Sequence, residues 1–447
     1  MLDDKLKALW ARISPPQKAA FFGCFLSGYL VHLYVFTNII PNSDGLSRIF
    51  DPQQMTVSGR WFLHFASYFN GFTQMPAVIG LFSVLFLALA AALAVSLLGI
   101  RSRALSALSG ALMAAFPAVG YTFLYLFTAS AYCFAIFLAV LSVSLARRGR
   151  WHWLAGCLLL ACSMGTYQAY VTVAIGLSLL VIFRETLDPS ASFSATLRLG
   201  VRLMLFLTAG AVLYYGILLV FLQVKDLELL SYLGMDAASS GYPFSRLPGL
   251  LLDTYKQVAA FFFLPGSANT FTSGWMAVLD LAALALGGGC FLLCMGQEGL
   301  WRARWRPLGG LAMLALLPLG INFGQILSPW SAPTPLMKYA FVLVYLAVVL
   351  LADRALPAAG AGASVLRRRA APCAALWLVL LLLFSLNTNN RLYTASAQAH
   401  RATLSYATRL ASRIESCPGY THGMPVYLIG SFPTDRVHNS VEGFAQV

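Results

Sequence analysis

Long apolar runs dominate this sequence and constrain its fold more than any other feature. They are about 18 to 25 residues long and alternate with short segments that carry Lys and Arg. A helix needs about 20 apolar residues to cross a bilayer, so each run has the length of a membrane-spanning helix. Backbone groups in lipid must bond internally, which favours helices, and the alternating pattern of a membrane barrel is absent. Because 59% of the residues are hydrophobic and 10% are charged, a soluble globular protein is excluded.

We therefore expect an all-α polytopic membrane protein with about eleven transmembrane helices. Two runs are too long for one span and are predicted to break, at Pro117–Tyr121 within residues 105–146 and at Gly165–Gln168 within residues 152–183. The other runs each predict one span. They cover residues 19–40, 76–98, 203–223, 276–296, 308–327, 336–352 and 372–387.

The basic residues indicate how these spans are oriented. Lys and Arg gather in short segments between spans, as at Arg101–Arg103, Arg147–Arg150 and Arg302–Arg306. Such clusters mark cytoplasmic loops, so we expect a cytoplasmic N-terminus and a C-terminus on the outer side of the membrane. The same distribution explains the net charge of +14 as a consequence of topology, and we expect no nucleic-acid partner.

We expect two domains on this topology. Residues 1–387 are predicted to form the transmembrane domain, with outer loops at 41–75 and 224–275. Residues 388–447 are predicted to form a small C-terminal α/β domain on the outer face. Its helical pattern runs from Thr394 to Arg413, and Pro425–Gly430 predicts a short buried strand before a glycine turn.

Polar residues of mixed chemistry recur at the outer ends of the expected spans and in the outer loops. Polar groups at the hydrocarbon boundary are costly unless they are paired or face water. A convergent set therefore predicts a cavity that opens outward. The set comprises Asp44, Arg60, Tyr121, Tyr125, Tyr167, Gln168, Asn322, Gln325, Lys338, Tyr339 and Arg391.

The charged members of this set each admit two interpretations. A carboxylate at Asp44 is suited to act as a general base on a hydroxyl, but Asp-Gly at a loop start also caps a short helix. Arg60 suits a phosphate leaving group because a guanidinium is bidentate and always charged. Its pairing with Trp61 is also common at the headgroup level. Lys338 either meets a phosphate or extends to the surface.

The remaining polar residues also admit two interpretations each. Tyr167 and Gln168 either hydrogen-bond sugar hydroxyls or satisfy the backbone of the helix break at which they lie. Asp280 either partners a cation or favours its helix start through the dipole. Histidines are scattered without ligand spacing, and most cysteines lie in apolar runs, where they behave as small hydrophobes. We expect no metal and no cofactor.

The order of motifs resembles the bacterial type-II glucosyltransferases of O-antigen serotype conversion. The resemblance rests on Asn42-Ser43-Asp44-Gly45, Ser58-Gly59-Arg60-Trp61, Tyr167-Gln168, Arg413-Ile414 and Pro425–Gly430. It implies a GT-C-like fold and an inverting glycosyltransferase integral to the bacterial inner membrane. Its donor would be a sugar, usually glucose, on undecaprenyl phosphate, and its acceptor a periplasmic polysaccharide such as O-antigen.

The resemblance also implies roles for individual residues. Asp44 matches the acid that serves as base in the first outer loop, and Gly45 stands where metal-dependent GT-C enzymes carry a second acid. We assign the donor phosphate to Arg60, Lys338 and Arg391. We assign the sugar or the acceptor to Trp61, Tyr121, Tyr167, Gln168, Asp51 and Asp280.

Two other functions stay open from the sequence. A lipid-linked glycan flippase or transporter would carry charged residues near the bilayer midplane and show repeat symmetry, and neither is evident. An O-antigen ligase or polymerase also acts on lipid-linked glycans. Such an enzyme typically places its catalytic residues in a long late loop, for which residues 224–275 are a candidate.

Overall fold

The computed structural model shows a bundle of helices. It describes residues 2–41, 43–46, 50–230, 244–266, 273–297, 299–328, 333–356, 365–427 and 429. Within these ranges the regular elements are α-helices and short 3₁₀-helices, and the extended pairings are the isolated bridges Phe50–Thr73 and Met55–Arg60. The all-α class expected from the hydropathy is confirmed.

Nine segments of the described chain are long and apolar enough to cross a membrane. They are α2 (Pro15–Thr37), α5 (Pro76–Leu98), α6 with α7 (Arg103–Ala115 and Pro117–Leu124), α8 (Leu126–Ala146), η3 with α10 (Gln168–Tyr170 and Val171–Thr186), α11 (Phe193–Val224), α13 (Gly274–Gln297), η6 with α16 (Pro335–Phe341 and Val342–Arg354) and α17 (Val365–Glu415). The other two expected spans correspond to α9 (Arg150–Thr166) and α14 (Trp305–Ile321), each 17 residues long. Length and composition thus support nine spans among the described residues and identify a membrane protein, and the eleven spans that we expected are not confirmed.

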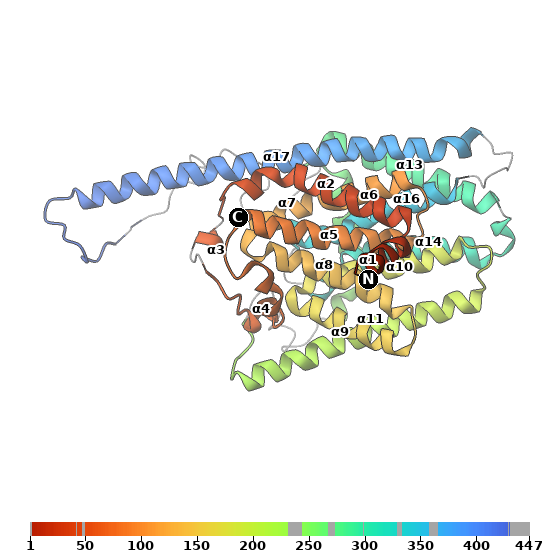
Figure 1. The fold of residues 1–447 in the computed structure, drawn as a ribbon, viewed down its shortest axis with the longest axis horizontal. Coiled ribbons are helices and arrows are strands. Elements are labelled where there is room, and N and C mark those ends of the chain that lie inside the picture. Colours follow the sequence, from red (N-terminus) through yellow and green to blue (C-terminus); the bar gives the residue numbers. More distant parts are fainter. Residues whose placement is uncertain are drawn as a thin grey trace.

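Neighbouring spans pack side by side around a continuous apolar core (Figure 1). Helix α2 packs against α5 and α6, α5 against α8, and α8 against α9, which in turn packs against α11. Helix α10 packs against α14, and α13 packs against α16 and α17. Short elements complete the described chain: α1 (Leu2–Arg12), α3 (Ser43–Leu46), η1 (Thr56–Ser58), α4 (Leu63–Ala66), η2 (Ser67–Asn70), η4 (Phe244–Arg246), α12 (Leu247–Phe263), η5 (Leu300–Arg302) and α15 (Phe323–Leu327).

The two ends of the bundle differ in their connections. At one end, residues 38–75 connect α2 to α5 and include α3 and α4, which both lie at the left-hand end of the bundle in Figure 1. We call this the loop end. At the other end, residues 99–102, 147–149 and 187–192 make short connections, and several arginines lie in or beside them. We call this the arginine end.

The break between α6 and α7 lies at Pro117, which cannot donate a helical hydrogen bond. Backbone carbonyls at such a break need other partners inside a membrane. Three of them accept from buried side chains of three other elements: Tyr339 Oη donates to Met113 O (3.2 Å), His32 Nε2 to Ala114 O (2.9 Å) and Asn389 Nδ2 to Ala115 O (2.7 Å). Because a carbonyl only accepts, His32 carries its proton on Nε2, and its Nδ1 accepts from the Tyr393 hydroxyl at 2.7 Å. The break therefore ties α2, η6 and α17 together.

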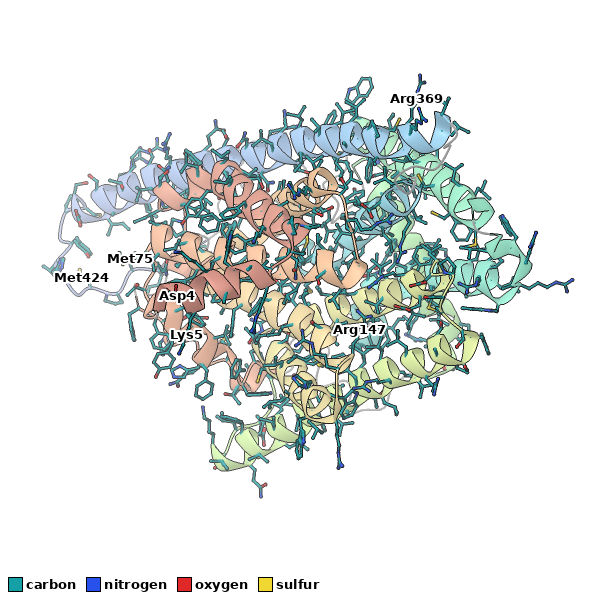
Figure 2. The ribbon with its side chains drawn as sticks, turned by 45° about the vertical axis from the view of Figure 1, so that its right-hand side comes forward. Asp4, Lys5, Met75, Arg147, Arg369 and Met424 are labelled. Carbon is teal, nitrogen blue, oxygen red and sulfur yellow. The ribbon has the colours of Figure 1, made fainter. Side chains whose placement is uncertain are left out.

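Helix α17 is unbroken over 51 residues and runs along one side of the bundle (Figure 1). At about 1.5 Å per residue it is longer than a bilayer core is thick. Its C-terminal part projects beyond the other helices. Figure 2 places Arg369, near its start, at the opposite end of the molecule from Met75 and Met424. The expected domain boundary at residue 387 falls inside this helix.

The strand expected at Pro425–Gly430 is not present in its described residues. Residues 425–427 and 429 have no regular structure, and Tyr427 and Ile429 are 86% and 97% exposed. An apolar run forms a strand where neighbouring elements bury it, and these side chains are not buried. The small α/β domain is therefore not confirmed. Residues 428 and 430–447, and residues 231–243 and 267–272 of the second outer loop, lie outside the described residues.

Candidate functional site

The segment Met55–Trp61 at the loop end folds into a tight turn. Gly59 has a φ of 77°, in the left-handed region that favours glycine. Its N–H donates to Thr56 O at 2.8 Å, and the Arg60 N–H donates to Met55 O at 3.1 Å. The turn therefore fixes the direction in which the Arg60 side chain leaves the backbone.

Two side chains from other elements hold this turn. Gln168 Nε2 donates to Ser58 O at 2.8 Å, and the Tyr214 hydroxyl of α11 donates to Gly59 O at 3.1 Å. Gln168 Nε2 also lies 3.2 Å from Tyr214 Oη. The amide nitrogen of Gln168 is thus engaged by the protein, and it positions the turn.

The helix break between α9 and η3 docks directly onto the same segment. The Phe62 N–H donates to Gly165 O at 2.7 Å, which gives a carbonyl at the break its partner. A Cβ on Gly165 would lie 2.5 Å from Trp61 Cε2, so only glycine permits this close approach. The two short motifs that the sequence analysis singled out are therefore in contact.

Arg60 lies against two stacked tyrosines. Its Nη1 donates to Tyr132 Oη at 3.2 Å, and its Cζ lies 5.0 Å from the centroid of the Tyr167 ring. The two rings have centroids 4.4 Å apart and planes 18° apart. A cation over an aromatic face gains about 0.5–2 kcal/mol, so the guanidinium is held in one place. The sequence predicted Arg60 and Tyr167 as site residues but did not predict Tyr132, which comes from α8.

A cavity of about 100 Å³ opens beside Arg60. Its wall includes two cations, Arg60 and Lys225, and the imidazole of His64. The other lining residues are Gln53, Gln54, Met55, Thr56, Trp61, Phe65 and Phe221. Since none of the described lining residues is an acid, the cavity favours an anion.

Lys225 is a cavity residue that the sequence analysis missed. Its Nζ lies 5.7 Å from the centroid of the Phe221 ring, which stacks on Trp61 with centroids 5.7 Å apart. This stack brings the end of α11 to the Arg60 turn. The sequence does contain a signal that could have identified it. Lys225 directly follows a span at its outer end, where basic residues are less common.

Asp44 is exposed in the first turn of the four-residue helix α3. The Gln74 side chain donates to Gly45 O at 2.7 Å and attaches this helix to the start of α5. No hydrogen bond or ion pair between two described residues joins Asp44 to Arg60 or Lys338. The role of Asp44 stays a prediction.

The other two acids of the expected site are engaged within the protein. Asp51 accepts from the Gln53 N–H at 2.9 Å, the bond of an Asx turn. Asp280 is 3% exposed and accepts from the Tyr345 hydroxyl at 2.9 Å. The partner that the described residues give Asp280 is thus a phenol and not a cation.

Lys338 and Tyr121 are buried where η6 packs against α7. Lys338 is 7% exposed, and its Nζ lies 5.6 Å from the centroid of the Phe261 ring. Tyr121 is 8% exposed. Lys338 therefore does not extend along its span to the protein surface, which was one of its two interpretations.

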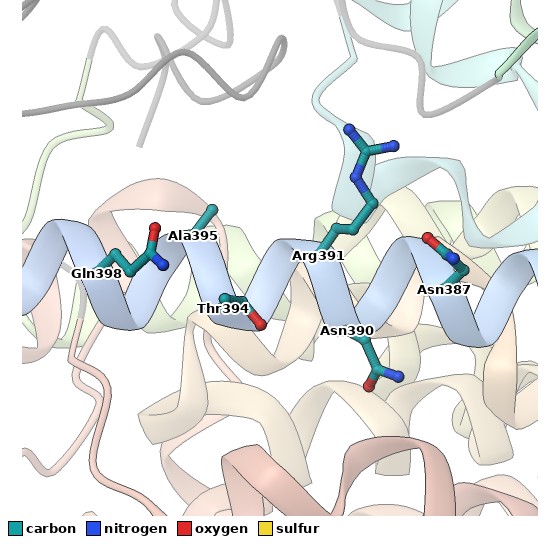
Figure 3. Close-up of a pocket in the computed structure, with 6 residues that line it drawn as sticks. All are labelled: Asn387, Asn390, Arg391, Thr394, Ala395 and Gln398. Atoms are coloured by element: carbon teal, nitrogen blue, oxygen red, sulfur yellow. The ribbon is translucent and has the colours of Figure 1, made fainter.

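Arg391 lines an open hollow of about 330 Å³ along α17. The described lining residues all belong to that helix: Asn387, Asn390, Arg391, Thr394, Ala395 and Gln398. Figure 3 shows the Arg391 and Asn390 side chains on different sides of the helix. Amides, a hydroxyl and a guanidinium are groups that hydrogen-bond sugars and phosphates.

The amide pair expected at the outer end of α14 and α15 consists of Asn322 and Gln325. Asn322 Nδ2 donates to Gln257 Oε1 at 3.1 Å. Gln325 is buried nearby in α15.

The described residues include no group of three or more His, Cys, Asp or Glu placed to hold a metal ion. The expectation that the protein uses no metal or cofactor stays a prediction.

Comparison with known proteins gives one assignment. No curated protein and no solved structure matches the chain. The family model described as glucosyl transferase GtrII matches residues 33–384, a range that contains Asp44, the Arg60 turn and the α9–η3 break. The match confirms the resemblance seen in the motifs. Because it covers most of the 447 residues, the chain belongs to the GtrII glucosyl transferase family.

Proposed function

We propose that this glucosyltransferase moves a glucosyl group from undecaprenyl phosphate onto a periplasmic polysaccharide such as O-antigen. The observation that carries the proposal is the cavity beside Arg60, whose described wall combines two cations with no acid. Such a cavity attracts the phosphate of a lipid-linked donor. Nucleotide donors are confined to the cytoplasm, so a reaction on the other side of the membrane requires a lipid-linked sugar.

The distribution of arginines supports an active site on the side of the membrane opposite the cytoplasm. The positive-inside bias assigns the arginine end to the cytoplasm of a bacterial inner membrane and the loop end to the periplasm. The N-terminus then lies in the cytoplasm and the C-terminus in the periplasm. The apolar, aromatic-rich spans offer a lipid-facing surface for the polyprenyl chain.

The chemistry requires a base and a stabilised leaving group. The acceptor hydroxyl oxygen bonds to the anomeric carbon while the bond from that carbon to the phosphate oxygen breaks, and the electron pair goes to the phosphate. Arg60, held by Tyr132 and Tyr167, stabilises the charge that develops there, and Lys225 adds a second cation. Asp44 takes the proton of the hydroxyl, and attack opposite the leaving group inverts the anomeric centre.

The other site residues are proposed with different support. Trp61 and Tyr167 adjoin Arg60, which favours contact with the donor sugar. Lys338 and Arg391 would meet the donor phosphate from η6 and α17. Tyr121, Asp51 and Asp280 stay proposals for the sugar or the acceptor, and residues 388–447 for a periplasmic domain.

Replacement of the base tests the mechanism. We expect Asp44→Asn to lower glucose transfer from undecaprenyl phosphate by about 10²- to 10⁴-fold, with unchanged folding, because general base catalysis contributes that factor. Transfer of labelled glucose by the purified protein measures the effect. The matched control is Asp253→Asn in α12, an exposed acid paired with Lys256 at 3.3 Å. Near-normal transfer by Asp44→Asn would reject the assignment of the base.

The same assay separates this function from its alternatives. A glucosyltransferase adds one labelled sugar to the acceptor glycan. A flippase would move the lipid-linked sugar across a vesicle membrane without forming a new glycosidic bond, and a ligase or polymerase would join preassembled glycan blocks. The family match favours the first outcome.

A further inference from the structure

The arginine end carries a second group of cations, remote from the cavity beside Arg60. Arg101 lies in the turn between α5 and α6, Arg184 near the end of α10, and Arg354 at the end of α16. All three stand at the ends of candidate membrane spans, so they lie at similar depth. That depth is where lipid headgroups meet a membrane protein.

Contacts with one turn bring these arginines together. Arg184 Nη1 donates to a carbonyl in the last turn of α5 at 3.0 Å, and a Cβ on Gly99 would lie 2.9 Å from Arg184 Cζ. Two residues after Gly99, Arg101 Nη2 donates to Asp353 O at 2.9 Å. Arg354 directly follows Asp353 and stands within electrostatic reach of both other arginines.

The first acid of this region is Asp353, whose carboxylate accepts hydrogen bonds from the turn between α5 and α6. Asp353 is 0% exposed, and its carboxylate accepts from the backbone N–H groups of Arg101 (3.1 Å) and Ser102 (2.8 Å). Arg101 Nε also donates to it at 3.3 Å. The carboxylate of Asp353 therefore fixes the α5–α6 turn.

The second acid bonds within its own loop. Asp188 accepts from the Ser190 hydroxyl at 2.7 Å and from the Ser190 N–H at 3.0 Å. The hydrogen bonds from Ser190 hold the pKa of the Asp188 carboxyl below its ordinary value, so this acid stays ionised. Within the described chain, neither Asp188 nor Asp353 forms an ion pair with Arg184 or Arg354.

Two guanidinium groups are thus left with hydrogen-bonding capacity. The Nε atoms of Arg184 and Arg354 are buried, and the described residues give them no acceptor. Of the two acids near the three cations, Asp353 pairs with Arg101, and Asp188 bonds to Ser190 while it stays within electrostatic reach of Arg184 and Arg354. Three cations against two acids leave the cluster with an excess of positive charge. A guanidinium presents a planar fork that matches the oxygens of phosphate, and a buried charge gains most from such a partner.

We propose that Arg101, Arg184 and Arg354 form a phosphate-binding site at the arginine end, separate from the cavity beside Arg60. At this depth a membrane supplies phosphate as the headgroup of an anionic lipid, and the aqueous phase supplies it as a free anion. The site rests on its own contacts and does not depend on the proposed function. Its occupant would brace α5, α10 and α16 against one another.

Thermal unfolding of the full-length protein in a neutral detergent tests the site. Phosphatidylglycerol, phosphatidylcholine and inorganic phosphate are added in separate arms. We expect phosphatidylglycerol to raise the Tm by a few degrees, because a ligand that binds the folded state stabilises it. A shift with phosphatidylglycerol alone identifies a lipid headgroup, and an equal shift with inorganic phosphate identifies a free anion. No shift in either arm overturns the proposal.

Variants of the proposed site test whether a rise in Tm depends on these arginines. Arg354→Gln should abolish the shift, and Arg101→Gln, whose side chain is 59% exposed, should reduce it without unfolding the protein. The matched control is Arg148→Gln, an exposed arginine between α8 and α9 at the same end. A shift that survives both test variants, or that Arg148→Gln removes equally, contradicts the site.

Discussion

Two long apolar runs are interrupted in this protein, one inside the span formed by α6 and α7 and the other between the consecutive helices α9 and η3, and the two breaks find their hydrogen-bond partners differently. At the α6–α7 break, buried side chains from α2, η6 and α17 donate to the carbonyls. At the α9–η3 break, the partner is the backbone of the segment that carries Arg60. A broken helix in a membrane must recruit donors. The first break therefore positions helices, and the second positions a cation.

The largest effect is expected where the second break meets the Arg60 segment. In Gly165→Ala the new Cβ would lie 2.5 Å from Trp61 Cε2, so Trp61 and the adjoining turn must move. We expect glucose transfer to fall by about 10²-fold, the cost of a displacement near 1 Å at a reacting centre. Steady-state transfer measures it. The control is Gly216→Ala in α11, where a Cβ meets nothing within 4 Å; an equal loss there would remove the argument.

The matching change at the first break should act on stability instead. In Gly120→Ala the new Cβ would lie 2.0 Å from Asn389 Oδ1. Overpacking of this kind costs about 1–3 kcal/mol of unfolding free energy. We expect a lower Tm, with transfer per folded molecule reduced much less than in Gly165→Ala. A Gly120→Ala protein that folds normally but does not transfer glucose would erase the distinction between the two breaks.

The smallest effect is expected at the edge of the first break. Tyr393→Phe removes the hydroxyl that donates to His32 Nδ1 and keeps the bond from His32 to Ala114 O. The loss of one hydrogen bond lowers the unfolding free energy by about 0.5–1.5 kcal/mol. Thermal unfolding measures this, and transfer should be unchanged. A large loss of transfer with a normal Tm would place Tyr393 in the chemistry.

The sequence predicted the all-α class and the places near Pro117 and Gly165 where the two longest apolar runs are interrupted, because hydropathy and Pro/Gly positions act locally; the eleven expected spans are not confirmed. It also predicted Arg60, Trp61, Tyr167 and Gln168 as site residues, and in the structure all four lie at the turn that carries Arg60. It did not predict the unbroken α17, because hydropathy falls near residue 387 while the residues that follow remain compatible with a helix.

Other features depend on contacts between distant segments, which a single sequence does not display. Lys225 reaches the cavity through the stacking of Phe221 on Trp61, across more than a hundred residues of chain. The hydrogen bond between Tyr345 and Asp280 joins residues 65 positions apart. The apolar run at Pro425–Gly430 looked like a strand, but its described side chains are exposed.

The most direct test of the central claim is the affinity of the purified protein for undecaprenyl phosphate. We predict that Arg60→Gln and Lys225→Gln each weaken binding by about 10- to 100-fold, because a charged hydrogen bond contributes about 1.5–3 kcal/mol. Lys256→Gln, an exposed lysine of α12, should bind as the unaltered protein does. Unchanged affinity in both Arg60→Gln and Lys225→Gln would contradict a donor phosphate in this cavity.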